Sequence, residues 1–185
     1  VEARQKQPGL IVVDRAVPGR NQNYLTPENT VPEKTLPYPW ESCIISGGSW
    51  SWIPDARYMS PRAVVHMLCD IVCKGGNLLL NIAPGPDGSW DPGAYEMLAG
   101  VGKWMDINSE AIYDTRPIEP YKEGKTCLTQ GKDGSTYLIY LAEEDESSPP
   151  ARIFSSTICP EANAKITLLG SDVLLQWEKN GTGFY

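Results

Sequence analysis

The chain has 185 residues, which is enough for one ordinary domain or for parts of two. Its composition, 41% hydrophobic and 21% charged, is that of a soluble globular protein and excludes an intrinsically disordered one. Sixteen basic residues against 23 acidic ones give a net charge of −7, which argues against nucleic acids and anionic membranes as partners. A neutral ligand suits this charge better.

The cysteines and the single histidine, His66, do not form a metal-binding pattern. No CxxC pair occurs among the five cysteines, which are Cys43, Cys69, Cys73, Cys127 and Cys159. Cys69 and Cys73 lie four residues apart on one face of an expected helix, so they are either metal ligands or core residues. We expect buried free thiols and no metal.

The two ends of the sequence do not resemble natural termini. The chain begins at Val1 without an initiator methionine or a signal-peptide pattern, and it ends at Tyr185 within an expected strand. No run approaches the roughly 18 apolar residues that a membrane span requires. We therefore expect a fragment of a larger protein.

The first expected element is a buried strand at residues 10–14. Four apolar residues followed by Asp14 and Arg15 are typical of a parallel strand that is buried on both faces. Because α/β barrels place their chemistry at the carboxyl ends of such strands, Asp14 and Arg15 are candidate site residues. The alternative is a simple ion pair at the end of a strand. Residues 16–39, rich in proline, are predicted to form a long loop of the kind that often carries binding residues.

Strands and helices alternate in the next part of the chain. Residues 40–45 are predicted to form a short strand, and Ser60 followed by Pro61 marks the start of a helix that ends at Gly75. A buried strand is predicted at residues 77–82 and a second helix at residues 91–107. This βα alternation predicts the closing units of a (β/α) barrel.

The pattern changes from helical to antiparallel β towards residue 120. Turn signals separate short β-type runs at residues 125–129, 136–142, 151–155, 164–169 and 173–177. We therefore predict an α/β fold: the C-terminal portion of a (β/α) TIM-like barrel at residues 1–118, followed by an antiparallel β-sandwich domain at residues 119–185 that we expect to be incomplete.

The stretch from residue 37 to residue 52 has the composition of a sugar-binding pocket. Glu41 follows Trp40, and Trp50 follows a Gly-Gly pair. Indole rings pack on the apolar face of a hexose, and a carboxyl group in an apolar setting suits proton donation to a glycosidic oxygen. The alternatives are a surface or helix-capping role for Glu41 and core packing for either tryptophan.

The planar guanidinium of Arg15 can donate hydrogen bonds to two adjacent sugar hydroxyls at once. The alternative is a salt bridge from Arg15 to Asp14 or Glu28.

Four motifs occur in series: LIVVDR ending at Arg15, YLTPE ending at Glu28, WESC starting at Trp40, and GGNLLLNIAPGPDG from Gly75 to Gly88. Together they resemble glycoside hydrolase family 29, the α-L-fucosidases, over residues 8–118. The resemblance implies a retaining exo-glycosidase that removes terminal α-L-fucose from fucosylated glycans or oligosaccharides. It also implies a barrel followed by a β-sandwich, no metal or organic cofactor, and a secreted, periplasmic or lysosomal location.

The resemblance also implies roles for individual residues. Glu41 matches the general acid/base, with Glu28 as a rival because family members differ in the loop that supplies this group. Arg15 matches the arginine that binds the fucose hydroxyls, and Trp40 and Trp50 match aromatic residues near the sugar. The aspartate nucleophile of the family is expected upstream, so the fragment alone is not expected to be active. Two alternatives stay open: an inactive, lectin-like fucose-binding relative, and a glycosidase for a different sugar.

Overall fold

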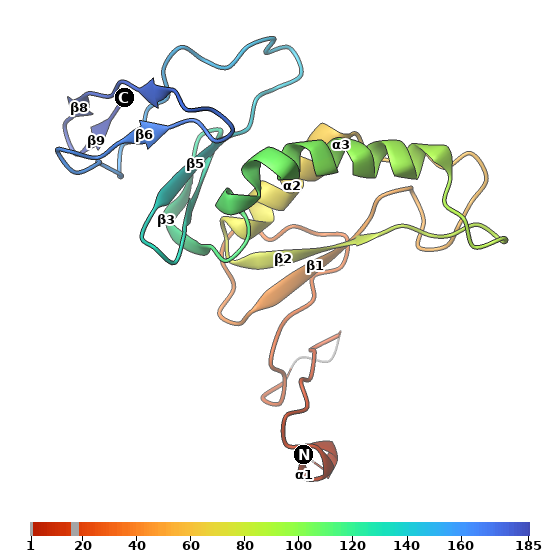
Figure 1. The fold of residues 1–185 in the computed structure, drawn as a ribbon. Coiled ribbons are helices and arrows are strands. Elements are labelled where there is room, and N and C mark those ends of the chain that lie inside the picture. The colour runs from red at the N-terminus through yellow and green to blue at the C-terminus, as the bar shows by residue number, and fades with distance from the viewer. Residues whose placement is uncertain (1, 16–18) are drawn as a thin grey trace. The chain divides into compact units, whose positions relative to one another are not determined.

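The computed structural model describes residues 2–15 and 19–185. The described chain forms two compact units, unit 1 up to Gly102 and unit 2 from Lys103 onward (Figure 1). This division falls within helix α3, Pro92–Asn108. The domain boundary between residues 118 and 119 stays a sequence prediction; the first antiparallel strand, β3, starts close to it, at Arg116.

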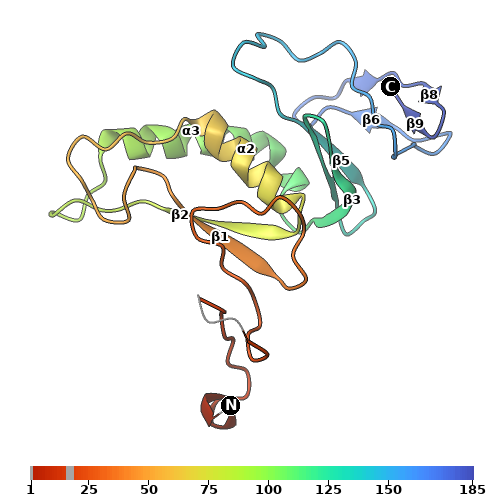
Figure 2. The ribbon, with the colours of Figure 1, turned by 180° about the vertical axis from the view of Figure 1, so that it is seen from behind.

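Unit 1 is built around two parallel strands joined by a helix. After the short helix α1, Glu2–Lys6, strand β1 spans Trp40–Ile45 and strand β2 spans Gly76–Asn81, in a register that pairs the first residues of both strands. Helix α2, Pro61–Val72, connects the strands and packs against β2, on one side of the pair in both views (Figure 2). This is the βαβ unit that the sequence predicts.

Helix α2 starts where the sequence indicates. Ser60 has an extended backbone, and its hydroxyl accepts a hydrogen bond from the backbone N–H of Ala63 at 3.2 Å. Pro61 occupies the first turn, where its missing N–H leaves no hydrogen bond unmade. After the helix, Gly75 takes a φ of 81°, which favours glycine, and turns the chain into β2.

Two extended segments continue the sheet beyond β1. Single parallel bridges join Val13 to Tyr24, Leu25 to Trp40 and Glu28 to Cys43, so four chain segments run parallel, in chain order. The predicted strand at residues 10–14 is therefore extended, but it pairs at one position and forms no ladder. Residues 16–18 of the predicted loop lie outside the described residues.

Unit 2 contains antiparallel sheets. Strands β3 (Arg116–Glu123), β4 (Thr126–Gln130) and β5 (Thr136–Tyr140) form one sheet in that order, with β4 buried. Two small hairpins pair β6 (Ile166–Thr167) with β7 (Leu174–Leu175), and β8 (Lys179–Asn180) with β9 (Gly183–Phe184). A three-residue 3-10 helix, η1, Ser109–Ala111, precedes these strands.

One predicted strand of unit 2 is wrong. Residues 151–155 form no strand, and only Ser155 pairs, through a single bridge to Phe184. Conversely, β3 forms where the sequence predicts no strand, because its two prolines, Pro117 and Pro120, weaken the strand pattern. The pairing of β3 with β4 shifts register between Pro117 and Lys122.

Candidate active site

One face of the parallel segments in unit 1 collects polar side chains. Side chains alternate between the two faces along a strand, and paired residues of parallel neighbours lie on the same face. Glu41 and Cys43 therefore share a face, and the bridge to Cys43 places Glu28 on it as well. On β2, Asn77 pairs with Glu41 and lies on the same side. We call the side that carries these residues the polar face.

Arg15 and Glu28 meet in an ion pair at this site. Nη2 of Arg15 lies 3.0 Å from Oε2 of Glu28, and both side chains are about half exposed, at 56% and 46%. The backbone of Arg15 has a φ of 25°, which is uncommon for a residue with a side chain. Of the two salt-bridge partners that the sequence allowed for Arg15, the structure selects Glu28.

The segment after Glu28 is fastened to β1. Asn29, with a φ of 49°, donates its backbone N–H to the carbonyl of Cys43 at 2.9 Å, and its Oδ1 accepts from the backbone N–H of Ile45 at 3.0 Å. The hydroxyl of Ser42 donates to the carbonyl of Thr30 at 2.8 Å. These bonds determine where the backbone of Glu28 lies relative to β1.

A buried lysine holds the loop that follows. Lys74, only 9% exposed, donates from Nζ to Oδ2 of Asp70 at 2.6 Å and to the carbonyl of Pro32 at 2.9 Å. A buried ammonium group needs such acceptors, because burial without them costs several kcal/mol or more. Lys74 therefore joins the end of α2 to the loop between Glu28 and β1.

Glu41 differs from Glu28 in its surroundings. Within the described part of the chain, the Glu41 carboxylate takes part in no hydrogen bond or ion pair. Burial raises the pKa of the Cys43 thiol; the charge of Arg15 lowers this pKa, and the carboxylates of Glu28 and Glu41 raise it further. These three charges therefore lie around one thiol, so the structure brings together Arg15, Glu28 and Glu41.

Trp40 lies on the opposite face of β1 from Glu41. Its side chain is 2% exposed and packs on Gly76, its partner in β2. Sequence neighbours in a strand point in opposite directions, so the structure does not bring the Trp40 indole beside the Glu41 carboxylate. In this chain Trp40 is a core residue.

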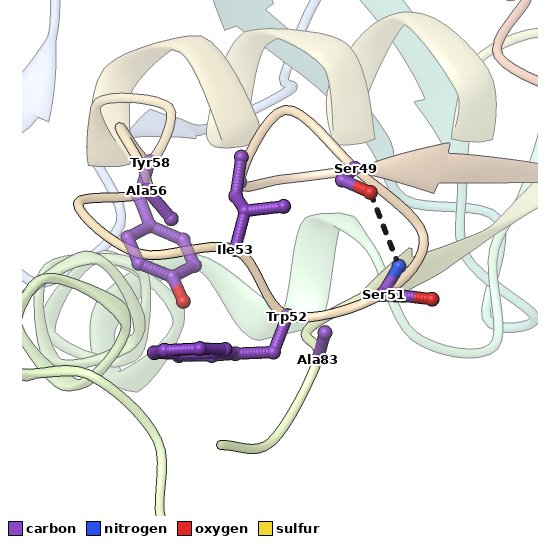
Figure 3. Close-up of a pocket in the computed structure, with 8 residues that line it drawn as sticks. Ser49, Ser51, Trp52, Ile53, Ala56, Tyr58 and Ala83 are labelled. Atoms are coloured by element: carbon purple, nitrogen blue, oxygen red, sulfur yellow. Dashed lines mark hydrogen bonds between the residues drawn. The ribbon is translucent and has the colours of Figure 1, made fainter. Parts of the chain in front are cut away.

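The loop after β1 forms a small hollow that faces solvent (Figure 3). The empty space in it is about 200 Å³ with the open mouth included, so the hollow is a shallow depression rather than an enclosed cavity. The residues around it are Gly47, Ser49, Ser51, Trp52, Ile53, Ala56, Tyr58 and Ala83. Trp50, one of the predicted sugar-binding residues, does not line the hollow and is 37% exposed, whereas Trp52 forms one wall.

Asp91 holds this loop from the start of α3. Its Oδ2 accepts from the Tyr58 hydroxyl at 3.3 Å, and its Oδ1 accepts from Nε1 of Trp52 at 3.4 Å. Burial and the neighbouring Asp91 carboxylate raise the pKa of Tyr58. The sequence predicts only a helix start at Asp91, because nothing in it links this residue to side chains more than 30 positions earlier.

Three of the five cysteines have the burial that the sequence predicts. All five cysteines are free thiols; Cys69, Cys73 and Cys127 are buried, as predicted, whereas Cys43 and Cys159 are half-buried. Among the helices of the described ranges 2–15 and 19–185, none is long and apolar enough to cross a bilayer.

Comparisons with known proteins identify the family. The family model described as alpha-L-fucosidase matches residues 1–110. The chain is 34% identical to tissue α-L-fucosidase of Bos taurus over 157 residues, which cover 81% of this chain and 32% of that protein. It is 30% identical to plasma α-L-fucosidase of Homo sapiens over 165 residues, covering 81% of this chain and 34% of that protein. The chain thus spans about a third of the length of these relatives.

Solved structures agree with the predicted fold. The α-fucosidase of Thermotoga maritima in complex with a mechanism-based inhibitor matches with a TM-score of 0.78 and 26% identity, over 99% of this chain and 42% of that one. The GH29 α-L-fucosidase of Bacteroides thetaiotaomicron matches with a TM-score of 0.79 at 20% identity, over 99% of this chain and 46% of that one, a likeness of fold alone. The predicted fold class, part of a (β/α) barrel followed by a β-sandwich, is confirmed. The chain belongs to the α-L-fucosidase family.

Proposed function

We propose that the polar face of unit 1 is one side of the active site of a retaining α-L-fucosidase acting on fucosylated glycans or oligosaccharides. Family membership supports the reaction class. The observation that carries the proposal is the meeting of Arg15, Glu28 and Glu41 on one face of parallel segments. One relative carries the name plasma α-L-fucosidase, and this supports a location outside the cytoplasm for this enzyme too.

Glu41 is the general acid/base in this proposal. Retaining hydrolysis uses two carboxyl groups about 5–5.5 Å apart, one attacking the sugar and one donating a proton to the leaving oxygen. The family resemblance assigns the attack to an aspartate that is not among the motifs of this chain. Glu41 suits the second role because no described cation holds its carboxylate. In the first step it protonates the glycosidic oxygen, and in the second it takes a proton from the attacking water.

Arg15, Glu28 and Trp50 bind the sugar in this proposal. The Arg15 guanidinium has donors left over beyond its contact with Glu28, and two of them can reach neighbouring hydroxyls. The Glu28 carboxylate accepts hydrogen bonds and keeps the guanidinium in place. Trp50 exposes its indole on the loop after β1, where it can pack on the apolar side of a fucose ring and its methyl group.

One observation favours Glu28 as the acid/base instead. Glu28 pairs with Cys43, two residues beyond Glu41 along β1, so it lies about 7 Å nearer the carboxyl end of the parallel segments. Barrel enzymes place their chemistry at this end. The two assignments make different predictions for chemical rescue.

The test is azide rescue in the complete protein. Glu41→Ala is expected to slow hydrolysis of fucosides with poor leaving groups by about 10²–10⁴-fold, because the leaving oxygen is no longer protonated. With an aryl fucoside whose leaving group needs no protonation, azide should restore turnover, because azide attacks the fucosyl-enzyme without a general base. Glu28→Ala should weaken binding without azide rescue, and Glu33→Ala, at an exposed acid in the same loop, should have no effect.

Three outcomes would overturn parts of the proposal. Rescue of Glu28→Ala rather than Glu41→Ala moves the acid/base role to Glu28. Fucose binding by the wild type without hydrolysis of any fucoside indicates a lectin-like relative. Faster turnover of a matched galactoside than of the fucoside indicates a different sugar specificity.

A further inference from the structure

We propose that Asp14 and Thr26 form a clamp that positions both members of the Arg15–Glu28 ion pair. The inference rests on the proposed function, in which Arg15 binds the sugar. Asp14 and Thr26 are positioning residues here, since neither is proposed to touch substrate. Both residues lie within the family motifs, and the proposal gives each of them a task that the resemblance does not assign.

One carboxylate oxygen makes all the contacts of the clamp. Oδ1 of Asp14 accepts from the backbone N–H of Arg15 at 2.7 Å, from the backbone N–H of Thr26 at 3.0 Å and from the hydroxyl of Thr26 at 3.1 Å. The backbone N–H of Asp14 donates in turn to the carbonyl of Tyr24 at 3.2 Å. Asp14 thus joins the end of the first parallel segment to the second one.

The clamp has a specific task at Arg15. A φ of 25° is strained for any residue with a Cβ, so the backbone of Arg15 keeps this angle only if other contacts hold it. The hydrogen bond from its N–H to Asp14 is such a contact. It directs the side chain of Arg15 towards Glu28 rather than along the strand.

The same oxygen also sets the path of the chain to Glu28. Thr26 is followed by Pro27, whose ring restricts the backbone and whose carbonyl accepts from the N–H of Cys43 at 3.0 Å. Glu28 comes next, in register with Cys43. A fixed Thr26 therefore leaves little freedom in the position of the Glu28 carboxylate, and the distance of 3.0 Å to Arg15 depends on both arms of the clamp.

The clamp requires an acceptor at Asp14 and does not require a charge. Asp14→Asn keeps an oxygen in the place of Oδ1, whereas Asp14→Ala removes it. Thr26→Ser keeps both donors of Thr26, whereas Thr26→Val keeps the N–H and removes the hydroxyl at nearly constant volume. These two matched pairs separate loss of positioning from loss of charge or of packing.

The first readout is fucoside hydrolysis by the complete protein. Asp14→Ala is expected to lower kcat/KM by about 10–100-fold, as misplaced binding groups do, mainly through KM because Arg15 binds the sugar. Asp14→Asn should stay within about threefold of the wild type, an allowance of about 0.6 kcal/mol. The kcat/KM of Thr26→Val should lie between the values for Asp14→Ala and Asp14→Asn. The kcat/KM of Thr26→Ser should be close to that of the wild type. Thermal unfolding of each variant shows that it is folded, and the Thr26 pair decides the matter if Asp14→Ala does not fold.

The second readout does not depend on activity. The charge of Arg15 lowers the pKa of the Cys43 thiol. If the Arg15 side chain moves away, this pKa rises, and a smaller fraction of Cys43 is thiolate at a fixed alkaline pH. Cys43 then reacts more slowly with iodoacetamide. Asp14→Ala should therefore slow alkylation of Cys43 relative to Asp14→Asn, which carries the same charge change. Peptide mass spectrometry distinguishes Cys43 from the other four thiols.

The outcomes separate the clamp from the proposed function. A wild type that hydrolyses no fucoside defeats the proposed function, while the alkylation rates still test the clamp. Equal rates for Asp14→Ala and Asp14→Asn in both readouts overturn the clamp. If Thr26→Val and Thr26→Ser have equal kcat/KM, the threonine hydroxyl is not part of the clamp.

Discussion

The indole of Trp40 packs on Gly76 so closely that a Cβ at position 76 would lie 2.4 Å from an atom of the ring. The two residues are register partners at the start of β1 and β2, and Trp40 is 2% exposed. The φ of Gly76 is not positive, so its backbone could be adopted by other residues. Glycine is needed here because a side chain would overlap the indole. The glycine that ends the α2 connection thus makes room for the largest side chain of the core.

We predict that Gly76→Ala destabilises the protein by about 1–3 kcal/mol, the usual cost of overpacking a core. Gly102→Ala is the matched control, since a Cβ there would meet nothing within 4 Å. Position 102 lies within α3, so this change should stabilise by about 0.4–1 kcal/mol. Urea unfolding followed by tryptophan fluorescence measures both, and a Gly76→Ala variant as stable as the wild type would contradict the packing.

We predict that Cys43 reports the charges of the candidate site. Burial raises the pKa of the thiol above its ordinary value of 9.0, so Cys43 should alkylate slowly at pH 8 and faster as pH rises further. Glu28→Gln removes a charge that raises this pKa and should speed alkylation; Arg15→Gln removes one that lowers it and should slow alkylation. A change at the distant, exposed Glu96 should leave the rate unaltered.

We predict that Asp91 restrains the loop after β1. Asp91→Ala removes the acceptor for both Tyr58 and Trp52, so the loop should open more often and trypsin should cleave faster after the exposed Arg57. The same variant should lower the pKa of Tyr58, which the Asp91 carboxylate helps to raise. Unchanged cleavage at Arg57 would show that other contacts hold the loop.

We predict that Glu146 makes unit 2 sensitive to acid. The backbone N–H of Glu143, the Tyr140 hydroxyl and the Lys125 ammonium lower the pKa of Glu146 from 4.5 to about 2. Because the folded pKa is depressed, the stabilisation is fully present above pH 4.5 and is lost as pH falls through about 2.

Glu146→Gln should therefore flatten the dependence of the free energy of unfolding on pH between about 5 and 2. Glu144→Gln, at an exposed neighbour, should leave this slope as it is. Urea unfolding at several pH values measures both slopes. Equal slopes for the wild type and Glu146→Gln would show that the hydrogen bonds do not discriminate between the folded and unfolded states.

Local sequence signals were sufficient for α2 and β2 of unit 1. The cap at Ser60 and the apolar spacing after it predict α2, and the structure starts the helix there with the expected hydrogen bond. The apolar run after Gly76 predicts β2 to within one residue. These features depend on contacts between residues close in sequence, so the sequence shows them directly.

Features that depend on pairing across the chain were not visible in the sequence. The residues of the long loop that pair with β1, Leu25 and Glu28, have no alternating pattern of their own. The resemblance places Trp40 near the sugar, but within β1 the side chains of Trp40 and Glu41 point to opposite faces. The indole packs instead on Gly76 of the neighbouring strand, a contact that only the pairing of β1 with β2 creates. In unit 2 the hairpin strands have two residues each, too few for a periodic signal.

The fastening of Asn29 to β1 has a consequence for the variation that this site can tolerate. The register of Glu28 is set by bonds at Cys43 and Ile45, and Thr30 is held by Ser42. Insertions or deletions between residues 33 and 38, beyond the bonds at Pro32 and Pro39, therefore change the length of a connection without changing which face Glu28 occupies. A one-residue shift before Asn29 would instead turn Glu28 to the buried side of the sheet. The chain can therefore vary in length after the bonds that Asn29 and Thr30 make to β1, but not before them.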